Sequence, residues 1–212
     1  LDDVTGLPNY RAFVARMVEE VSRATRYGVP LSVLLADIDQ FEDYAMRLGP
    51  ETGDEIIRTV ARLLQSKVRA VDTVARYGTK QFGIILPHTE QEGATLLAER
   101  LCRAIEAGPW SFGELTASFG VTTVTSSNDD GKTCIAQAYR AMRHSALTGK
   151  NRVTHARASA IERVVPWGEV PAVRIMDSLG ALASLELSSE NGERPDSGDD
   201  SNGSRAGDKF SF

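Results

Sequence analysis

The sequence has little of what several classes of protein require. Its 212 residues include two cysteines, too few for a disulfide framework or a cysteine-based metal cluster. The three histidines share no metal-ligand spacing. No apolar run is long enough to cross a membrane, and no signal peptide is evident. These absences favour a cytoplasmic protein with no metal site and no membrane segment in this part of the chain.

The chain also lacks the excess of basic residues that a general nucleic-acid binder needs. Twenty-four Lys and Arg residues stand against 29 Asp and Glu residues, for a net charge of −5. We expect the basic residues Arg140, Arg143 and Lys150 to lie on the solvated face of a helix rather than in a nucleic-acid patch. The first residue is Leu1 and not Met, which suggests a piece of a longer protein with a missing upstream domain.

Composition divides the chain into three parts. The length suits one domain with an extension, and we assign residues 1–157 to the folded domain. Residues 158–187 hold two short apolar clusters, which suggest a short docking helix. Residues 188–212 are rich in Ser, Gly, Asp and Asn, with six acidic residues against three basic ones. Such a segment buries too little apolar area to offset its ordering entropy, so we expect a disordered acidic tail.

The hydrophobic pattern of the first part alternates between helix and strand periods. We expect a strand at 31–36, a hairpin at 74–86, a strand at 115–124 and a short terminal strand at 151–153. Helices are expected from Tyr10 to Gly28, from Thr52 to about Arg69, from Thr89 to Gly108 and before Gly149. Mixed strand order with helices packed on the sheet predicts an α+β sandwich.

Two carboxylates end the first strand. Asp37 and Asp39 flank Ile38 at the end of the strand, and we expect the two carboxylates to lie on opposite faces. A carboxylate at a strand end commonly holds Mg²⁺ and phosphate, but a second carboxylate is usually needed. The hairpin tip, where it would be expected, offers Lys80 and Gln81. Asp37 is therefore either part of a former metal site or an ordinary strand-end carboxylate paired with a nearby base.

Several motifs, in order and at matching spacing, resemble one family. They are Asp37-Ile38-Asp39-Gln40-Phe41, Gly53-Asp54, Arg76-Tyr77-Gly78 with Phe82, Ser118-Phe119-Gly120-Val121 and Gly149-Lys150-Asn151-Arg152-Val153. Together they look like the GGDEF family, the diguanylate cyclases of bacterial second-messenger signalling, over roughly residues 1–155. The resemblance implies a nucleotidyl-cyclase-like fold, with a mostly antiparallel five-stranded sheet surrounded by helices. Active members condense two GTP into cyclic di-GMP across a dimer.

The signature of that family, Gly-Gly-Asp/Glu-Glu-Phe, is degenerate here. Its first Gly is kept as Gly78, but Thr79 replaces the second Gly, which lets the backbone approach phosphates. Lys80 replaces the acidic metal ligand and Gln81 the next acidic residue. Asp37 keeps the position of the other metal-binding carboxylate. The resemblance thus implies that the charge at the metal position is reversed, and that an ammonium beside Asp37 takes the place of the metal.

The nucleotide contacts implied by the resemblance are also depleted. The Asn that reads guanine is replaced by Ala45, although its Asp partner is kept as Asp54. The phosphate-binding Lys of the last helix falls at Ala146, while the basic residue after the closing Gly is kept as Lys150. Glu42 stands where a Lys is usual. We therefore predict no catalytic residues, no bound metal, no cyclic di-GMP synthesis and at best weak GTP binding.

A second site of the family is kept. Many members bind their product at an inhibitory site built on Arg-x-x-Asp, which here matches Arg69 and Asp72, with a supporting arginine at Arg100. Arginine can fork to a guanine edge or a phosphate, and aspartate accepts from the guanine N1 and N2 donors. An ordinary structural interpretation also exists, since Arg69 would lie at a helix C-terminus and Asp72 would open a turn.

The sequence thus predicts an inactive GGDEF domain that acts as a cyclic di-GMP receptor, needs no cofactor and signals by protein contact. A homodimer or a ligand-bridged dimer is one expectation. The first alternative is a scaffold that binds no nucleotide. The second is a cyclase with residual activity, for which Asp37 and Asp54 would have to suffice. The protein partner and the role of the tail do not follow from the sequence.

Overall fold

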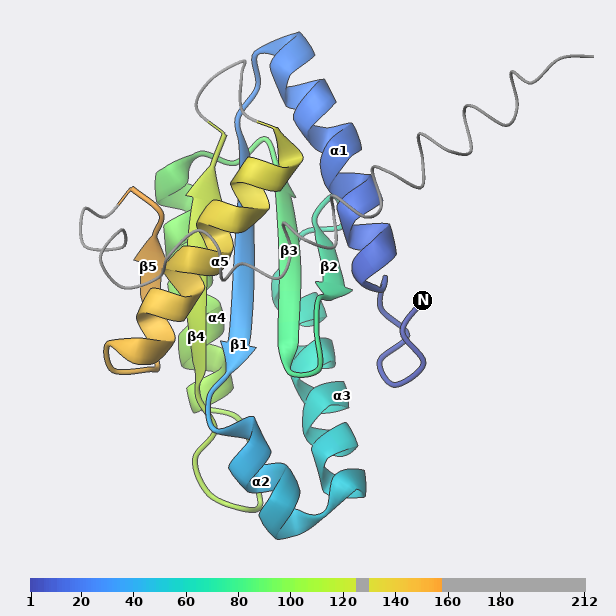
Figure 1. Cartoon of the computed structure of the whole chain (residues 1–212), viewed down its shortest axis with the longest axis vertical. Coiled ribbons are helices and arrows are strands. Elements are labelled where there is room, and N and C mark those ends of the chain that lie inside the picture. Colours follow the sequence, from blue (N-terminus) through green and yellow to red (C-terminus); the bar gives the residue numbers. More distant parts are fainter. Residues whose placement is uncertain (125–129, 158–212) are drawn as a thin grey trace, which may run out of the picture. The chain divides into compact units, whose positions relative to one another are not determined.

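The computed structural model describes residues 1–124 and 130–157, and the predicted extension and acidic tail lie outside these ranges. The described chain forms five helices and five strands (Figure 1). They are α1 (Tyr10–Tyr27), β1 (Leu31–Ile38), α2 (Phe41–Leu48), α3 (Pro50–Lys67), β2 (Thr73–Arg76), β3 (Gln81–Pro87), α4 (Gln91–Glu106), β4 (Ala117–Thr123), α5 (Gly131–Leu147) and β5 (Val153–His155). The predicted α+β class is confirmed.

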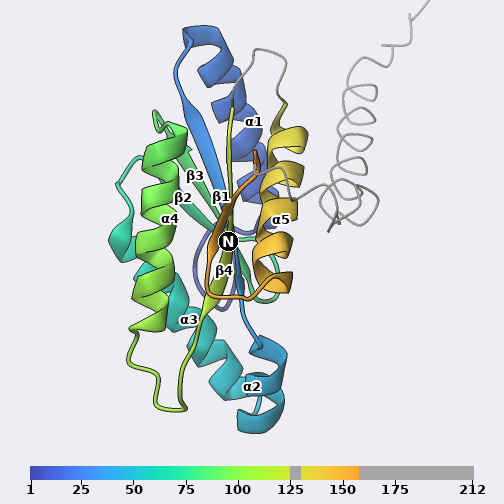
Figure 2. The ribbon, with the colours of Figure 1, turned by 90° about the vertical axis from the view of Figure 1, so that its left-hand side faces the viewer.

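The strands form one sheet in the order β2-β3-β1-β4-β5. All neighbours are antiparallel except β4 and β5, which run parallel. The central strand β1 is buried along its whole length, as its continuous apolar run predicts. Helices cover both faces, with α3 and α4 on one side of the sheet and α1 and α5 on the other (Figure 2). The hydrophobic core therefore has two layers, one on each face of the sheet.

The side chains of β1 alternate between these two layers. Leu34 and Ile38 pack with residues of α3 and α4, whereas Val33 and Leu35 pack with residues of α1 and α5. Its neighbour β4 approaches α5 at Gly120, where an added Cβ would overlap the Ala138 carbonyl oxygen. Glycine is thus required for the contact between the sheet and α5.

Several expected boundaries move by a few residues. Residues 41–48, expected to be irregular or helical, form the helix α2, and α3 starts at Pro50, a favoured first position in a helix. The terminal strand covers 153–155 and not 151–153. The strand begins two residues later than expected because Lys150 and Asn151, with φ angles of 60° and 43°, form a left-handed turn before it.

The prediction of a solvated basic face is wrong for Arg140, whose exposed fraction is 5%. Arg143 is half-buried and Lys150 is exposed. The reason is that α5 packs on β1, β4 and β5 and also contacts α1, so residues on more than one side of the helix are covered. In the described ranges, no helix has the length and apolarity to span a membrane.

Candidate functional site

The hairpin between β2 and β3 is closed at its tip by backbone hydrogen bonds. The amide N–H groups of Tyr77 and Gly78 both donate to the carbonyl oxygen of Gln81, at 2.9 and 3.1 Å. This closes the tip and places Lys80 and Gln81 beside the end of β1, since Gln81 is the register partner of Asp37. The sheet thus brings Lys80 and Gln81 next to the carboxylate of Asp37.

Lys80 lies between two carboxylates. Its Nζ is 3.3 Å from Asp37 Oδ1 and 2.9 Å from Glu42 Oε2. Asp37 is buried, with an exposed fraction of 3%, and Gln81 Nε2 donates to its second oxygen at 2.8 Å. Both oxygens of the Asp37 carboxylate are therefore paired, one with Lys80 and one with Gln81. Among the described residues, no group of three His, Cys, Asp or Glu side chains could hold a metal.

The pKa values of these groups reflect the arrangement. Burial raises the pKa of Asp37, and the contacts with Gln81 and Lys80 oppose that rise only in part. Burial disfavours the ammonium form of Lys80, but Glu42 and Asp37 outweigh it and raise the pKa of Lys80. The hydrogen bond from Lys80 lowers the pKa of Glu42. The ammonium is thus the stable form of Lys80 at neutral pH.

Asp39 has a different role from Asp37. It is buried and accepts hydrogen bonds from the hydroxyls of Thr116 and Ser118, at 2.7 and 2.8 Å, and from the amide of Asn151 at 3.0 Å. These bonds tie the end of β1 to the start of β4 and to the turn before β5. Both oxygens of this carboxylate are engaged in holding the fold. The expected place on the opposite face from Asp37 is wrong, because residues two apart in a strand share a face, and Ser118, the register partner of Asp37, donates to Asp39.

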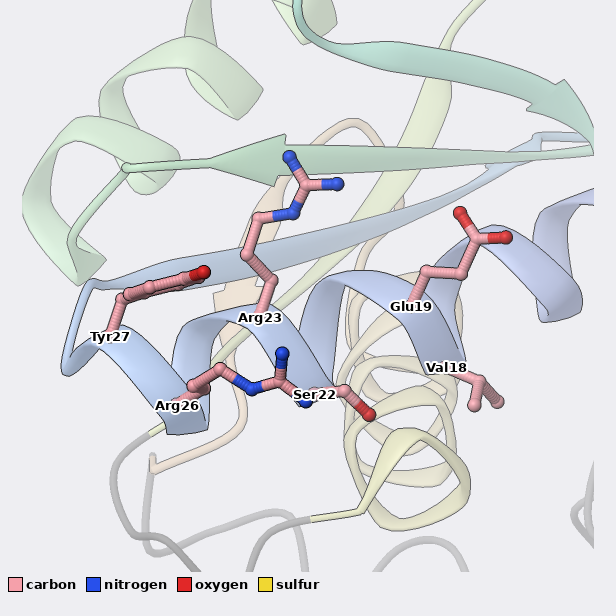
Figure 3. A pocket seen from close by; sticks show the side chains of 6 residues that line it. All are labelled: Val18, Glu19, Ser22, Arg23, Arg26 and Tyr27. Carbon is pink, nitrogen blue, oxygen red and sulfur yellow. The ribbon is translucent and has the colours of Figure 1, made fainter.

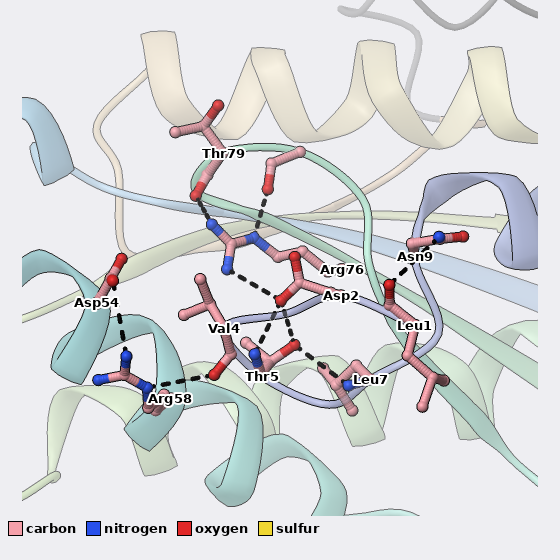
Figure 4. Close-up of polar contacts among 11 residues, drawn as sticks. Leu1, Asp2, Val4, Thr5, Leu7, Asn9, Asp54, Arg58, Arg76 and Thr79 are labelled. Atoms are coloured by element: carbon pink, nitrogen blue, oxygen red, sulfur yellow. Dashed lines mark hydrogen bonds and ion pairs between the residues drawn. The ribbon is translucent and has the colours of Figure 1, made fainter.

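The other nucleotide positions of the family are scattered. Asp54 is exposed and pairs with Arg58, its Oδ2 lying 3.6 Å from Arg58 Nη2 (Figure 4). Ala45 packs against the core cluster and its methyl group offers no hydrogen bond. Lys150 is exposed on the turn after α5. Of the retained positions, Asp37 alone contacts the hairpin tip among the described residues.

Arg76 braces the same hairpin, which the sequence reasoning did not foresee. Its Nε donates to the Gly78 carbonyl at 2.5 Å and its Nη2 donates to the Thr79 carbonyl. Its Nη1 lies 3.8 Å from Asp2 Oδ1, and Asp2 in turn accepts from the amide and hydroxyl of Thr5 (Figure 4). The sequence offered one indication of this contact, an arginine two residues before Gly78. The brace joins the N-terminal turn to the hairpin.

The predicted Arg-x-x-Asp turn is formed at the end of α3. The amide of Arg69 donates to Asp72 Oδ2 at 2.8 Å, and the amide of Asp72 donates to the Arg69 carbonyl at 3.0 Å. The other carboxylate oxygen, Asp72 Oδ1, is buried and has no hydrogen-bond partner. A buried acceptor without a donor is costly and rare.

Arg100 completes this site from the neighbouring helix α4. Its Nη2 donates to the carbonyl oxygen of Lys67, the last residue of α3, at 2.8 Å. The three predicted residues line one cavity of about 330 Å³, as do Lys67, Val68, Leu86, Thr89, Gly93, Leu96, Leu97 and Arg103. The sequence reasoning missed Lys67 and Arg103, although Arg103 lies one helical turn after Arg100.

A separate groove runs along the outer side of α1 (Figure 3). It has a volume of about 500 Å³ and is lined by Val18, Glu19, Ser22, Arg23, Arg26 and Tyr27. None of the residues predicted from the sequence lies in it.

The sheet order, the two helical layers and the signature hairpin define a nucleotidyl-cyclase-like domain of the GGDEF type. The chain belongs to the GGDEF family, because residues 1–152 match the family described as "Diguanylate cyclase, GGDEF domain". It is 33% identical over 158 residues to the response regulator PleD of Caulobacter vibrioides, covering 72% of this chain and 35% of PleD. It is 35% identical over 156 residues to the diguanylate cyclase DgcP of Pseudomonas aeruginosa, covering 72% and 23%.

The chain thus spans about a third or less of the length of these relatives. Among solved structures, the GGDEF domain of DgcB from Caulobacter crescentus, in complex with c-di-GMP, superposes with a TM-score of 0.72 at 26% identity. That match covers 74% of this chain and 95% of the DgcB chain. The active GGEEF domain of a diguanylate cyclase from Vibrio cholerae superposes with a TM-score of 0.69 at 28% identity. That match covers 72% of this chain and 99% of the Vibrio cholerae chain. The predicted fold is confirmed.

Proposed function

We propose that this GGDEF domain is a catalytically inactive receptor for cyclic di-GMP. The ligand binds in the cavity formed by Arg69, Asp72 and Arg100, and the bound state is read by a protein partner in the cytoplasm. The observation that carries the proposal is the contrast between the two sites. Lys80 is paired with Asp37, where the resemblance implies a metal, whereas Arg69, Asp72 and Arg100 line one cavity together with further basic residues.

The first half of the proposal is the loss of catalysis. Phosphoryl transfer depends on metal ions that neutralise the developing charge and on exact positioning of the phosphates. A divalent ion does not fit here, because it would meet the ammonium of Lys80 at the carboxylate that it needs, Asp37. No catalytic step can be assigned to these residues.

The second half is the retained ligand site. The exposed guanidinium of Arg69 makes no hydrogen bond or ion pair with a described residue and is available to a phosphate or to the O6/N7 edge of guanine. The carboxylate of Asp72 in the wall of the cavity is the acceptor for the guanine N1 and N2 donors. The c-di-GMP complex of the related DgcB domain supports the choice of ligand.

Calorimetric titration with cyclic di-GMP and with GTP, side by side, tests the proposal. The wild-type chain should bind cyclic di-GMP, and the double variant Arg69→Ala/Asp72→Ala should lose that binding. Arg11→Ala is a matched control, since Arg11 is an exposed arginine on α1, outside the cavity. Unchanged binding by the double variant would overturn the site, and no binding by the wild type would overturn the receptor function.

A nucleotide-independent scaffold is the second candidate. It is favoured by the way Lys80 replaces a metal with an internal ion pair, which lets the hairpin keep its shape without any ligand. The two candidates differ in thermal unfolding. A ligand that binds only the native state raises the melting temperature, so an unchanged melting temperature with saturating cyclic di-GMP would favour the scaffold.

The oligomeric state needs a separate measurement. Light scattering with and without cyclic di-GMP would separate a constitutive homodimer from a ligand-bridged dimer.

Residual cyclase activity is the third candidate and has the least support, because Asp37 is engaged by Lys80 and Gln81 and Asp54 is engaged by Arg58.

A further inference from the structure

The cavity around Asp72 carries more positive charge than the Arg-x-x-Asp motif requires. Four basic side chains line it, and Asp72 is the single acidic residue in its wall. They are Lys67, Arg69, Arg100 and Arg103. On a chain with a net charge of −5, this is a local reversal of sign. Such a concentration of cations attracts anionic ligands and holds them in the cavity.

These cations are not neutralised within the described part of the chain. The side chains of Lys67, Arg69 and Arg103 form none of the ion pairs or side-chain hydrogen bonds found among the described residues, and Arg100 donates to a neutral carbonyl. The four positive charges outnumber the one negative charge of Asp72 in the same wall, so they repel one another and lower stability. An anion that binds among them removes this repulsion, so the cluster favours a charged ligand.

The four cations come from two sides of the cavity. Arg69 stands on the turn with Asp72, and Lys67 ends α3 just before it. Arg100 and Arg103 are three residues apart and so share one face of α4. That face continues one turn earlier to Leu96, an apolar side chain whose exposed fraction is 57%. The wall of the cavity on α4 thus combines two guanidinium groups with an apolar surface suited to the face of a base.

We propose that Lys67 and Arg103 form a second anion-binding pair in this cavity, distinct from the pair Arg69 and Arg100. The cavity then takes a ligand with two separate phosphates, one at each pair. This makes Lys67 and Arg103 the residues that distinguish a cyclic dinucleotide from a mononucleotide. The inference rests on the proposed receptor function and adds to it a basis for specificity.

Titrations with cyclic di-GMP and with GMP, at fixed ionic strength, test the inference. The wild type should bind cyclic di-GMP at least about tenfold more tightly than GMP, since a second charge-assisted contact is formed. Lys67→Ala and Arg103→Ala should each weaken cyclic di-GMP binding by roughly three- to tenfold and leave GMP binding within about twofold. In the double variant the two ligands should bind alike. Arg62→Ala, an exposed arginine of α3 outside the cavity, is the control.

The outcomes separate this inference from the receptor function. If Lys67→Ala/Arg103→Ala binds cyclic di-GMP as the wild type does, while Arg69→Ala/Asp72→Ala does not bind, the second pair is wrong and the receptor stands. If the double variant loses both ligands equally, the two residues strengthen binding without selecting the ligand, which also overturns the inference. If the wild type binds neither ligand, both proposals fail.

Discussion

Lys80 Nζ lies 3.3 Å from Asp37 Oδ1, so an ammonium group stands beside a buried carboxylate at the end of β1. Glu42 holds the same ammonium from α2, at 2.9 Å. The ammonium of Lys80 thus joins the hairpin to the end of β1 and to the start of α2 by two ion pairs.

We predict that the purified protein makes no cyclic di-GMP. Incubation with GTP and Mg²⁺ should give no product above a blank without protein, because no divalent ion can be held beside Lys80. A diguanylate cyclase with an acidic tip serves as the positive control. GTP should bind weakly at best, and micromolar affinity measured by calorimetry would contradict that part of the prediction.

We predict that Lys80→Met destabilises the fold by about 2 kcal/mol at neutral pH, since it leaves Asp37 buried without its counter-charge. The loss should depend on pH. Burial already raises the pKa of Asp37 above 3.8, and removing Lys80 raises it further, so the carboxyl is protonated and neutral in acid. The stabilisation of ionised Glu42, whose pKa Lys80 lowers below 4.5, also disappears in acid.

Urea denaturation of wild type and Lys80→Met across the acid range measures this effect. The two proteins should be nearly equal in stability below the usual pKa values of the two carboxyls and should diverge as the pH rises to neutral. Lys80→Arg retains the positive charge and should behave more like the wild type. A stability difference that is the same at all pH values would show that Lys80 acts through packing and not through its charge.

We predict that Arg76→Ala loosens the hairpin and costs about 1–3 kcal/mol, because two carbonyl groups of the tip lose their charged donor. Arg76→Lys should recover only part of the loss, since one ammonium cannot reproduce a planar fork. Amide hydrogen exchange at Tyr77 and Gly78, whose N–H groups donate to the Gln81 carbonyl, reports the effect locally. Full protection of these amides in Arg76→Ala would contradict the role of the brace.

We predict that Gly120→Ala costs about 3 kcal/mol or prevents folding, since its Cβ would overlap the backbone of α5 at Ala138 and Met142. Gly53→Ala is the matched control. Its Cβ would lie 3.4 Å from Phe41 Cζ, and alanine is the better helix former in α3. Thermal unfolding of both variants is the measurement, and equal melting temperatures would contradict the close approach of β4 and α5.

Much of the fold could be predicted from the sequence because its signals are local. The apolar run of β1, the left-handed Gly28 after α1 and the Arg69–Asp72 turn depend on neighbouring residues and appear where they were expected. The replacement of acids by Lys80 and Gln81 is likewise visible in the sequence alone. The expected boundaries were less exact, as the turn at Lys150 and Asn151 shows, because a terminal strand is positioned by its pairing with β4.

What the sequence by itself determined is therefore the family, the order of the elements and the loss of the acidic tip. Only the tertiary structure decided which groups meet. It placed Glu42, 38 residues away in the chain, next to the ammonium of Lys80, and it engaged Asp39 in hydrogen bonds between strands. It also buried Arg140 and brought Lys67 and Arg103 into one cavity with Asp72. The physical reason is that charge pairing and burial depend on packing between distant segments, which local propensity does not encode.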